Sequence, residues 1–115
     1  MTDNFEIAEL LIKHGADVNN QNNNGETALF KTRRTKIAKL LIEHGADVNI
    51  QDNTGQTALF FKYDPDIIEL LIKHGADVNI QDNNGQTAAM KASNNDNYGL
   101  MHLLNKHSAD SNTNR

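Results

Sequence analysis

Cysteine is absent from the 115-residue sequence, and proline occurs only once. Without cysteine the chain forms no disulfide and offers no thiolate ligand to a metal ion. Long apolar runs are also lacking, since segments such as LLI and ALFF are far shorter than the roughly 20 residues of a membrane-spanning helix. The net charge of −4 argues against a general nucleic-acid-binding role. We therefore expect neither a membrane protein nor a nucleic-acid-binding one.

The N-terminal segment MTDNFEIAELLIKHG does not have the pattern of a secretion signal. It carries acidic residues where a signal peptide needs a basic region. This predicts an intracellular protein, in the first place cytoplasmic, with the nucleus or the cytoplasm of a host cell as alternatives.

What the sequence does contain is repetition. The block LLIKHGADVN occurs at 10–19 and 70–79, with the near-copy LLIEHGADVN at 40–49 and an eroded copy, LLNKHSADSN, at 103–112. The starts of these blocks are 30, 30 and 33 residues apart. Repetition at such a period predicts an array of stacked units in place of one irregular globule.

The unit at 55–79 shows how each repeat is expected to begin. Thr57 is predicted to cap a short first helix with its hydroxyl, which can accept a backbone N–H. Asp64 followed by Pro65 predicts the start of a second helix, because proline at the first helical position loses no hydrogen bond. The threonine recurs in the other units as Thr27 and Thr87, and in the second unit Thr35 could cap in place of Arg34.

The rest of the unit predicts how the repeats hold together. Residues 67–72 form a wide apolar helix face, and Gly75 supplies a left-handed stop. A polar stretch follows, in which Asn84-Gly85 is a strong signal for a tight turn. Neither helix is long enough to be stable by itself, so stacking of neighbouring units must bury the apolar faces.

These motifs resemble the ankyrin repeat, whose signature is a G-x-T-P-L-H opening, a leucine-rich second helix and a G-A-D-V-N close. Openings of this kind stand at 25–30, 55–60 and 85–90, and closes at 15–19, 45–49 and 75–79. The resemblance covers nearly the whole chain and implies an all-α ankyrin-repeat solenoid of stacked helix-turn-helix units with projecting hairpin loops. It implies one domain, divided into a half repeat at 1–24, repeats at 25–54 and 55–84, and a C-terminal capping repeat at 85–115.

The sequence departs from the family pattern in the opening and in the period. Proline of the opening is alanine in every copy, and its histidine is phenylalanine or methionine. The two 30-residue units also lack three residues between their helices, relative to a family period of about 33. We therefore expect a shorter first helix, or a tighter loop, in these units.

The two ends of the array are expected to differ. Asn105 and Ser111 stand where the other units have isoleucine and valine, which predicts a polar cap on the last repeat. The first unit has a second helix with no first helix before it, yet it keeps apolar residues: Ala8, Leu11, Ile12 and Val18. Such an uncovered face predicts fraying, weak self-association of an otherwise monomeric chain, or a lost upstream portion.

Two sets of polar residues recur in register and invite a metal or catalytic interpretation. They are His14, His44, His74 and His107, and Asp17, Asp47, Asp77 and Asp110. Equivalent positions of stacked helices lie about 8–10 Å apart, whereas a shared zinc needs each ligand at about 2 Å. We expect the histidines to be ordinary residues at helix C-termini and the aspartates to cap turns. The sequence also lacks the phosphate-loop and nucleophile motifs of enzymes, so we expect no catalysis, metal or cofactor.

The resemblance also points to a possible modification. In ankyrin repeats, an asparagine at the hairpin can be hydroxylated by an asparaginyl hydroxylase, and the matching residues here are Asn19, Asn49 and Asn79. A purely structural turn asparagine is the favoured alternative.

Ankyrin arrays usually bind partners through their hairpin tips and first helices. The tips are nearly identical here, so the candidate partner-binding residues are those that vary after the first helix: Lys31, Arg33, Arg34, Phe61, Lys62, Tyr63, Lys91 and Asn94. The alternatives are that the charges form a solvated surface and that Phe61 fills space left by the shortened connection. Tyr63 is expected to be exposed.

Two hypotheses of function follow. The first is a protein–protein interaction module whose partner, of unknown identity, offers an acidic or aromatic segment. The alternative is a structural or self-associating spacer, such as a fragment of a longer ankyrin protein, which the near-identity of the units favours.

Overall fold

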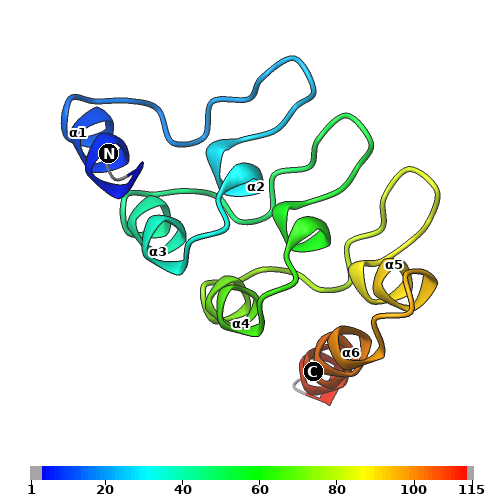
Figure 1. Cartoon of the computed structure of the whole chain (residues 1–115). Helices are drawn as coiled ribbons and strands as arrows, with labels where there is room; N and C mark the ends of the chain where they lie inside the picture. Colours follow the sequence, from blue (N-terminus) through cyan, green and yellow to red (C-terminus); the bar gives the residue numbers. More distant parts are fainter. Residues whose placement is uncertain (1–3, 114–115) are drawn as a thin grey trace.

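Short helices alternate with long polar loops along residues 4–113, the part of the chain that this computed structural model describes; side-chain environments are described for residues 5–108. The second helices of the units form one row (Figure 1): α1 (Asn4–Lys13), α3 (Thr35–Glu43), α4 (Pro65–Lys73) and α6 (Tyr98–Thr113). The first helices form a second row: α2 (Ala28–Lys31), η1 (Ala58–Phe61) and α5 (Ala88–Asn94). This is the predicted all-helical array of stacked pairs, with no strand in the described residues.

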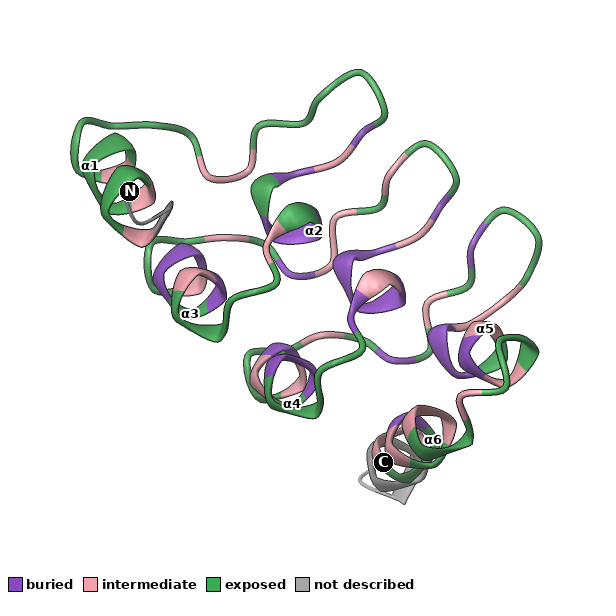
Figure 2. Ribbon diagram, in the orientation of Figure 1, coloured by how far each residue is buried: buried purple, intermediate pink, exposed green. Residues whose placement is uncertain are grey.

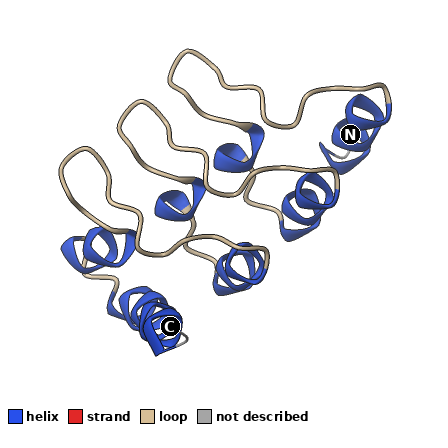
Figure 3. Ribbon diagram, turned by 180° about the vertical axis from the view of Figure 1, so that it is seen from behind, coloured by secondary structure: helices blue, strands red, loops and turns tan. Residues whose placement is uncertain are grey.

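The loops between units project from the same side of the helix rows, as Figure 3 shows from behind. Each closes on itself: in the middle hairpin the Asp52 N–H donates to the Gln56 carbonyl oxygen at 2.8 Å. Neighbouring hairpins are also joined, because the Asn83 N–H donates to the Thr54 carbonyl oxygen at 2.9 Å. The hairpins therefore form a continuous layer beside the helices.

The first helices of the 30-residue units are short, as the missing three residues predict. The α2 helix is a single turn of four residues, and η1 is a four-residue 3₁₀ helix. The α5 helix of the 33-residue unit has seven residues. The deletion thus removes about one turn at the end of the first helix and leaves the second helices in place.

Capping of these first helices differs from the prediction. Only Thr87 accepts a helical N–H through its hydroxyl, from Met90 at 3.3 Å, within the described residues. In α2 and η1 the same N–H donates instead to the threonine's carbonyl oxygen, at 3.0 and 3.1 Å. The hydroxyl caps predicted for Thr27 and Thr57 are therefore wrong, because a single tight turn closes through the backbone.

The predicted capping of the second helices is confirmed for α4, where an aspartate is followed by proline. Asp64 accepts the Asp66 N–H at 2.9 Å, and Pro65 occupies the first position of α4. Arg34 precedes α3 without a side-chain cap bond, and Thr35 lies inside that helix, so the alternative cap at Thr35 is wrong. Gly75 ends the following turn with a φ of +97°, the predicted left-handed stop.

The core lies between the two rows of helices and runs through the stack (Figure 2). Leucines at one repeat position show how burial depends on neighbours. Leu41 and Leu71 are 4% and 0% exposed, because units pack against them on both sides. The equivalent Leu11 on α1 is 57% exposed, which confirms the predicted uncovered N-terminal face at this residue. Ile12 and Val18, predicted to share this face, are partly buried against the core.

The last unit departs from its predicted shape. The sequence pattern places His107 at a helix end, but α6 continues through it to Thr113. The physical reason is Ser108, which stands where the other units have a glycine in the left-handed conformation and therefore allows the helix to continue. A turn at Asp110 is likewise wrong, since this residue is helical. Asn105 is exposed, as a polar cap requires, while the side chain of Ser111 lies outside the described residues.

Candidate protein-binding surface

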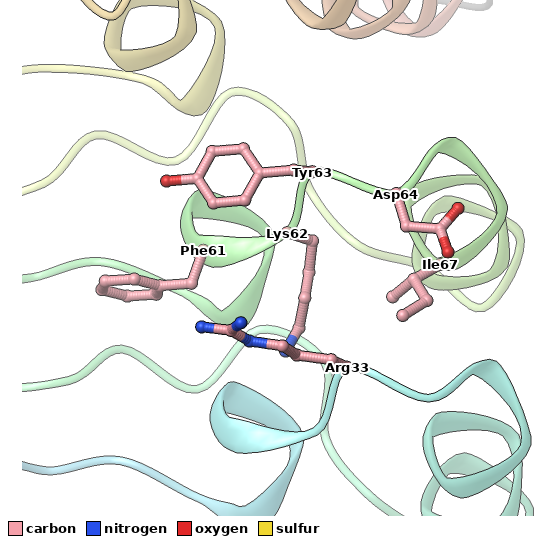
Figure 4. A pocket seen from close by; sticks show the side chains of 6 residues that line it. All are labelled: Arg33, Phe61, Lys62, Tyr63, Asp64 and Ile67. Atoms are coloured by element: carbon pink, nitrogen blue, oxygen red, sulfur yellow. The ribbon is translucent and has the colours of Figure 1, made fainter.

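Four of the candidate partner-binding residues meet in one pocket of about 340 Å³ (Figure 4). Arg33 comes from the loop after α2, whereas the other residues come from η1, from the segment that leads into α4, and from α4 itself. The lining residues are Arg33, Phe61, Lys62, Tyr63, Asp64 and Ile67. The pocket therefore forms where the shortened connections of two successive units lie side by side.

Lys62 is the unexpected member of this pocket. Its side chain is only 4% exposed, and its ammonium donates to the carbonyl oxygens of Phe30 at 3.0 Å and Thr32 at 2.5 Å. These oxygens lie at the C-terminal end of α2, where the helix dipole favours a cation. Burial, and then the nearby charge of Arg33, lower the pKa of Lys62 to about 8. The solvated-surface interpretation is therefore wrong for this lysine, which joins two units.

Phe61 is partly buried against the core and contacts residues of the preceding and the following unit. Its ring centroid lies 5.8 Å from that of Phe30, and the Lys91 ammonium lies 4.2 Å above its ring. Such cation–π contacts add roughly 0.5–2 kcal/mol. Lys91 also donates to the Gln56 side-chain oxygen at 3.4 Å, and burial lowers the pKa of Lys91. Phe61 and Lys91 thus help to hold the pocket wall in place, while Tyr63 is 61% exposed, as expected.

A second, larger cavity of about 660 Å³ lies between α1, α2 and α3. Its apolar wall is the uncovered N-terminal face, and its basic rim comes from the second unit. The lining residues are Ile7, Ala8, Leu11, Ala28, Lys31, Thr32, Arg33, Arg34 and Ile37. Arg33 therefore lines both cavities. Lys31 forms an ion pair with Glu26 at 2.9 Å, which holds the pKa of the Glu26 carboxyl below its usual value.

The structure places Asn94 apart from the other candidates. It is exposed at the end of α5 and lines neither cavity. The eight candidate residues thus separate into two adjoining cavities that share Arg33, a supporting lysine on the Phe61 ring, and one isolated asparagine.

The asparagines at the hairpin position form bonds between units. Asn49 donates to the Gly75 carbonyl oxygen at 3.0 Å and accepts the Asp77 N–H at 2.8 Å. Asn19 makes the equivalent pair of bonds with Gly45 and Asp47, and the Asn79 oxygen accepts from the Ser108 hydroxyl at 2.6 Å. A structural role is therefore shown, and hydroxylation of the same residues stays a prediction.

Five of the recurring histidines and aspartates make structural hydrogen bonds within the described residues. The aspartates of the first three blocks cap their turns, each accepting the N–H of the asparagine two residues later: Asp17, Asp47 and Asp77. His44 Nδ1 lies 2.9 Å from the Leu40 carbonyl oxygen, and His107 Nε2 lies 3.2 Å from the Glu69 carboxylate. The residues described contain no group of three or more such side chains that could hold a metal ion.

Sequence reasoning missed the part played by Asp82. This carboxylate is buried in the last hairpin, where it accepts from the Gln56 side chain at 3.0 Å and from two N–H groups of its own turn. The bond from Gln56 is the main reason that the pKa of Asp82 is lowered. The local signal was a turn aspartate, but nothing local indicates its contact with the preceding unit.

Comparison with known families agrees with this geometry. The family model described as ankyrin repeats (3 copies) matches residues 1–62 and 60–115. The chain therefore belongs to the ankyrin repeat family, and the resemblance seen in its motifs is confirmed. Such domains are generally protein-binding modules and are typically non-catalytic. No curated protein matches the chain. Within residues 4–113, we find no helix with the length and apolar character needed to cross a membrane.

Proposed function

We propose that this ankyrin domain binds a protein partner through the two cavities on either side of Arg33. The observation that supports this most is their composition: apolar or aromatic walls with an exposed arginine between them. Arginine and aromatic residues are over-represented where protein interfaces gain most of their energy. The stacked core and the hairpin bonds hold the surface in place beforehand, so binding loses little conformational entropy.

The basic rim favours an acidic partner segment. Lys31, Arg33 and Arg34 lie together on the second unit, in a chain whose net charge is −4. A local patch of opposite sign to the rest of the protein steers a complementary partner to this surface. Exposed Tyr63 adds an aromatic contact beside it.

A capture experiment tests the proposal. Wild-type protein and an Arg33→Glu/Arg34→Glu variant are immobilised, and the proteins retained from a cell extract are identified by mass spectrometry. The matched control is Lys73→Glu/Lys106→Glu, which reverses two exposed charges that line neither cavity. A partner retained by wild type and control, but lost by the arginine variant, supports the proposal. Equal retention by all three proteins would show that the binding surface lies elsewhere.

Self-association is the second candidate function, and the uncovered face of α1 favours it. Ile7, Leu10 and Leu11 are exposed there, beside the larger cavity. Burying such side chains against a second copy would stabilise a dimer by removing apolar area from water. Sedimentation of wild type and Leu11→Lys over a wide concentration range distinguishes the cases. A dimer that Leu11→Lys disrupts supports self-association, whereas a wild-type monomer at high concentration excludes it.

A further inference from the structure

The pocket between η1 and the loop after α2 contains two positive charges with no carboxylate bonded to them. The ion pairs found within residues 4–113 include neither Arg33 nor Lys62. An ammonium group has three N–H donors, and the two bonds to Phe30 and Thr32 account for two of them. One donor of Lys62 and the guanidinium of Arg33 therefore have no bonded acceptor among the described residues.

Burial makes this arrangement unusual. Lys62 is almost fully removed from solvent, although a buried charge is costly unless an opposite charge or several hydrogen bonds compensate it. The two carbonyl oxygens compensate only part of this cost, and the like charge of Arg33 adds to it. An anion that reached both groups would relieve this repulsion and gain charge-assisted hydrogen bonds.

The lining of the pocket indicates which chemical group should lie next to that anion. The side chains of Phe61, Tyr63 and Ile67 give most of the pocket an apolar lining. Figure 4 shows Arg33 and the amino end of Lys62 on one side of the pocket, and Asp64 and Ile67 on another. The volume of about 340 Å³ is at the lower end of the range for ligand pockets. It suits one ring-bearing side chain, or a carboxylate with an adjoining ring.

Asp64 limits how much negative charge the pocket can accept. One of its carboxylate oxygens accepts the Asp66 N–H at the start of α4, which fixes the group at the rim. A second anionic group placed there would be repelled. The pocket is therefore suited to a single carboxylate and not to a dense run of negative charge.

We propose that Arg33 and Lys62 bind one carboxylate of an acidic partner segment, while Phe61 and Tyr63 receive an aromatic ring next to it. This inference rests on the proposed protein-binding function and names the chemistry that its smaller pocket recognises. The carboxylate accepts from the Arg33 guanidinium and the remaining Lys62 N–H. The ring packs against the two aromatic side chains.

Phenylacetate is a minimal probe of this chemistry, because it joins one carboxylate to one ring. Its amide, phenylacetamide, has the same shape without the charge. Both are titrated into ¹⁵N-labelled full-length protein, with sodium acetate as the ionic-strength control. For a ligand of so few non-hydrogen atoms, the dissociation constant of phenylacetate should be in the millimolar range. We expect saturable shifts of the amide signals of Arg33 and residues 61–64, and at least about tenfold weaker binding of phenylacetamide.

Variants identify the groups responsible. Arg33→Gln is expected to weaken phenylacetate binding at least about tenfold, whereas Lys36→Gln, which removes an exposed charge outside the pocket, should leave it unchanged. Lys62→Met should also weaken binding. If Lys62→Met does not fold, the comparison of Arg33→Gln with Lys36→Gln still decides the question.

The inference is overturned if phenylacetate and phenylacetamide bind equally, if acetate produces the same shifts, or if Arg33→Gln binds like wild type. These outcomes are separate from a failure of the proposed function. Capture of a partner that still depends on Arg33, together with no phenylacetate binding, would reject carboxylate recognition while leaving protein binding in place. Loss of the Arg33 dependence in the capture experiment would reject the proposed function itself.

Discussion

A Cβ atom added to Gly55 would lie 2.6 Å from the side-chain oxygen of Asn83 and 2.8 Å from its backbone nitrogen. Gly85 has nearly the same backbone conformation, with a φ of +78° against +83°, but a Cβ there would meet no atom within 4 Å. Both glycines therefore need a left-handed backbone, but they differ in the space around them. Only Gly55 is also needed so that the neighbouring hairpin can approach.

This difference predicts unequal effects of alanine. Gly85→Ala should lower the free energy of unfolding by about 1–2 kcal/mol, the cost of a side chain in the left-handed region. Gly55→Ala should lose a further ~1–3 kcal/mol, because the Asn83 backbone must move away. Urea titrations followed by circular dichroism measure both losses. Equal losses would mean that the hairpins do not pack as closely as the structure shows.

Asn49 predicts a second comparison within the repeat. Its amide bonds to both Gly75 and Asp77 of the next unit, whereas the Asn79 oxygen accepts from the Ser108 hydroxyl. Asn49→Ala should therefore cost about 1–2 kcal/mol, and Asn79→Ala about half as much, since water can replace part of these exposed bonds. Thermal unfolding of the two variants under identical conditions provides the test. A larger loss for Asn79→Ala would contradict the stabilising role of the two bonds that Asn49 makes with the next unit.

The leucines of the repeated block provide a third prediction. Leu71→Ala in the middle of the stack should cost about 2–5 kcal/mol, because it leaves a cavity between units. Leu104→Ala, in the last unit, should cost less, although that residue is also buried. Leu11→Ala should cost under about 1 kcal/mol, because its side chain is already mostly exposed. Denaturant titrations rank the three, and equal losses would be inconsistent with a stacked array.

Much of this fold could be predicted because its signals are local and repeated. The glycine stop at Gly75 and the cap at Asp64 each follow from a few adjacent residues, and the short first helices follow from the 30-residue spacing of the units. The uncovered face of α1 could also be predicted, since apolar residues without a preceding first helix show it directly.

The environment of the candidate site was harder to predict. Lys62 lies between Phe61 and Tyr63 in a segment that varies between units, and its burial depends on carbonyl oxygens 30 and 32 residues earlier in the chain. No pattern in the adjacent residues predicts hydrogen bonds to carbonyl oxygens so far away in the sequence.

The end of α6 was predicted wrongly for a different reason. The last copy of the block still resembles the other three, but it has Ser108 where they have a glycine, and the helix continues through this serine. A long-range contact and a single substitution thus account for these two errors, whereas the wrong hydroxyl caps at Thr27 and Thr57 come from local turn geometry.

The buried position of Lys62 predicts that stability rises with pH. Its pKa is about 8 in the folded protein and about 10.5 when unfolded, because burial disfavours the charged ammonium. Below pH 8 the Lys62 amine is protonated in both states, so the folded state carries the full free-energy cost of burying the charged ammonium. Between these pKa values the unfolded chain binds more protons, and the free energy of unfolding increases with pH. The neutral amine keeps two N–H groups for Phe30 and Thr32.

Relative to Lys62→Met, the free energy of unfolding of wild type should increase by about 1–2 kcal/mol between about pH 7 and pH 9.5. Urea titrations of both proteins at each pH measure this difference, in which the other titrating groups cancel. A difference that stayed constant, or fell with pH, would rule out a lowered pKa for Lys62 in the folded protein.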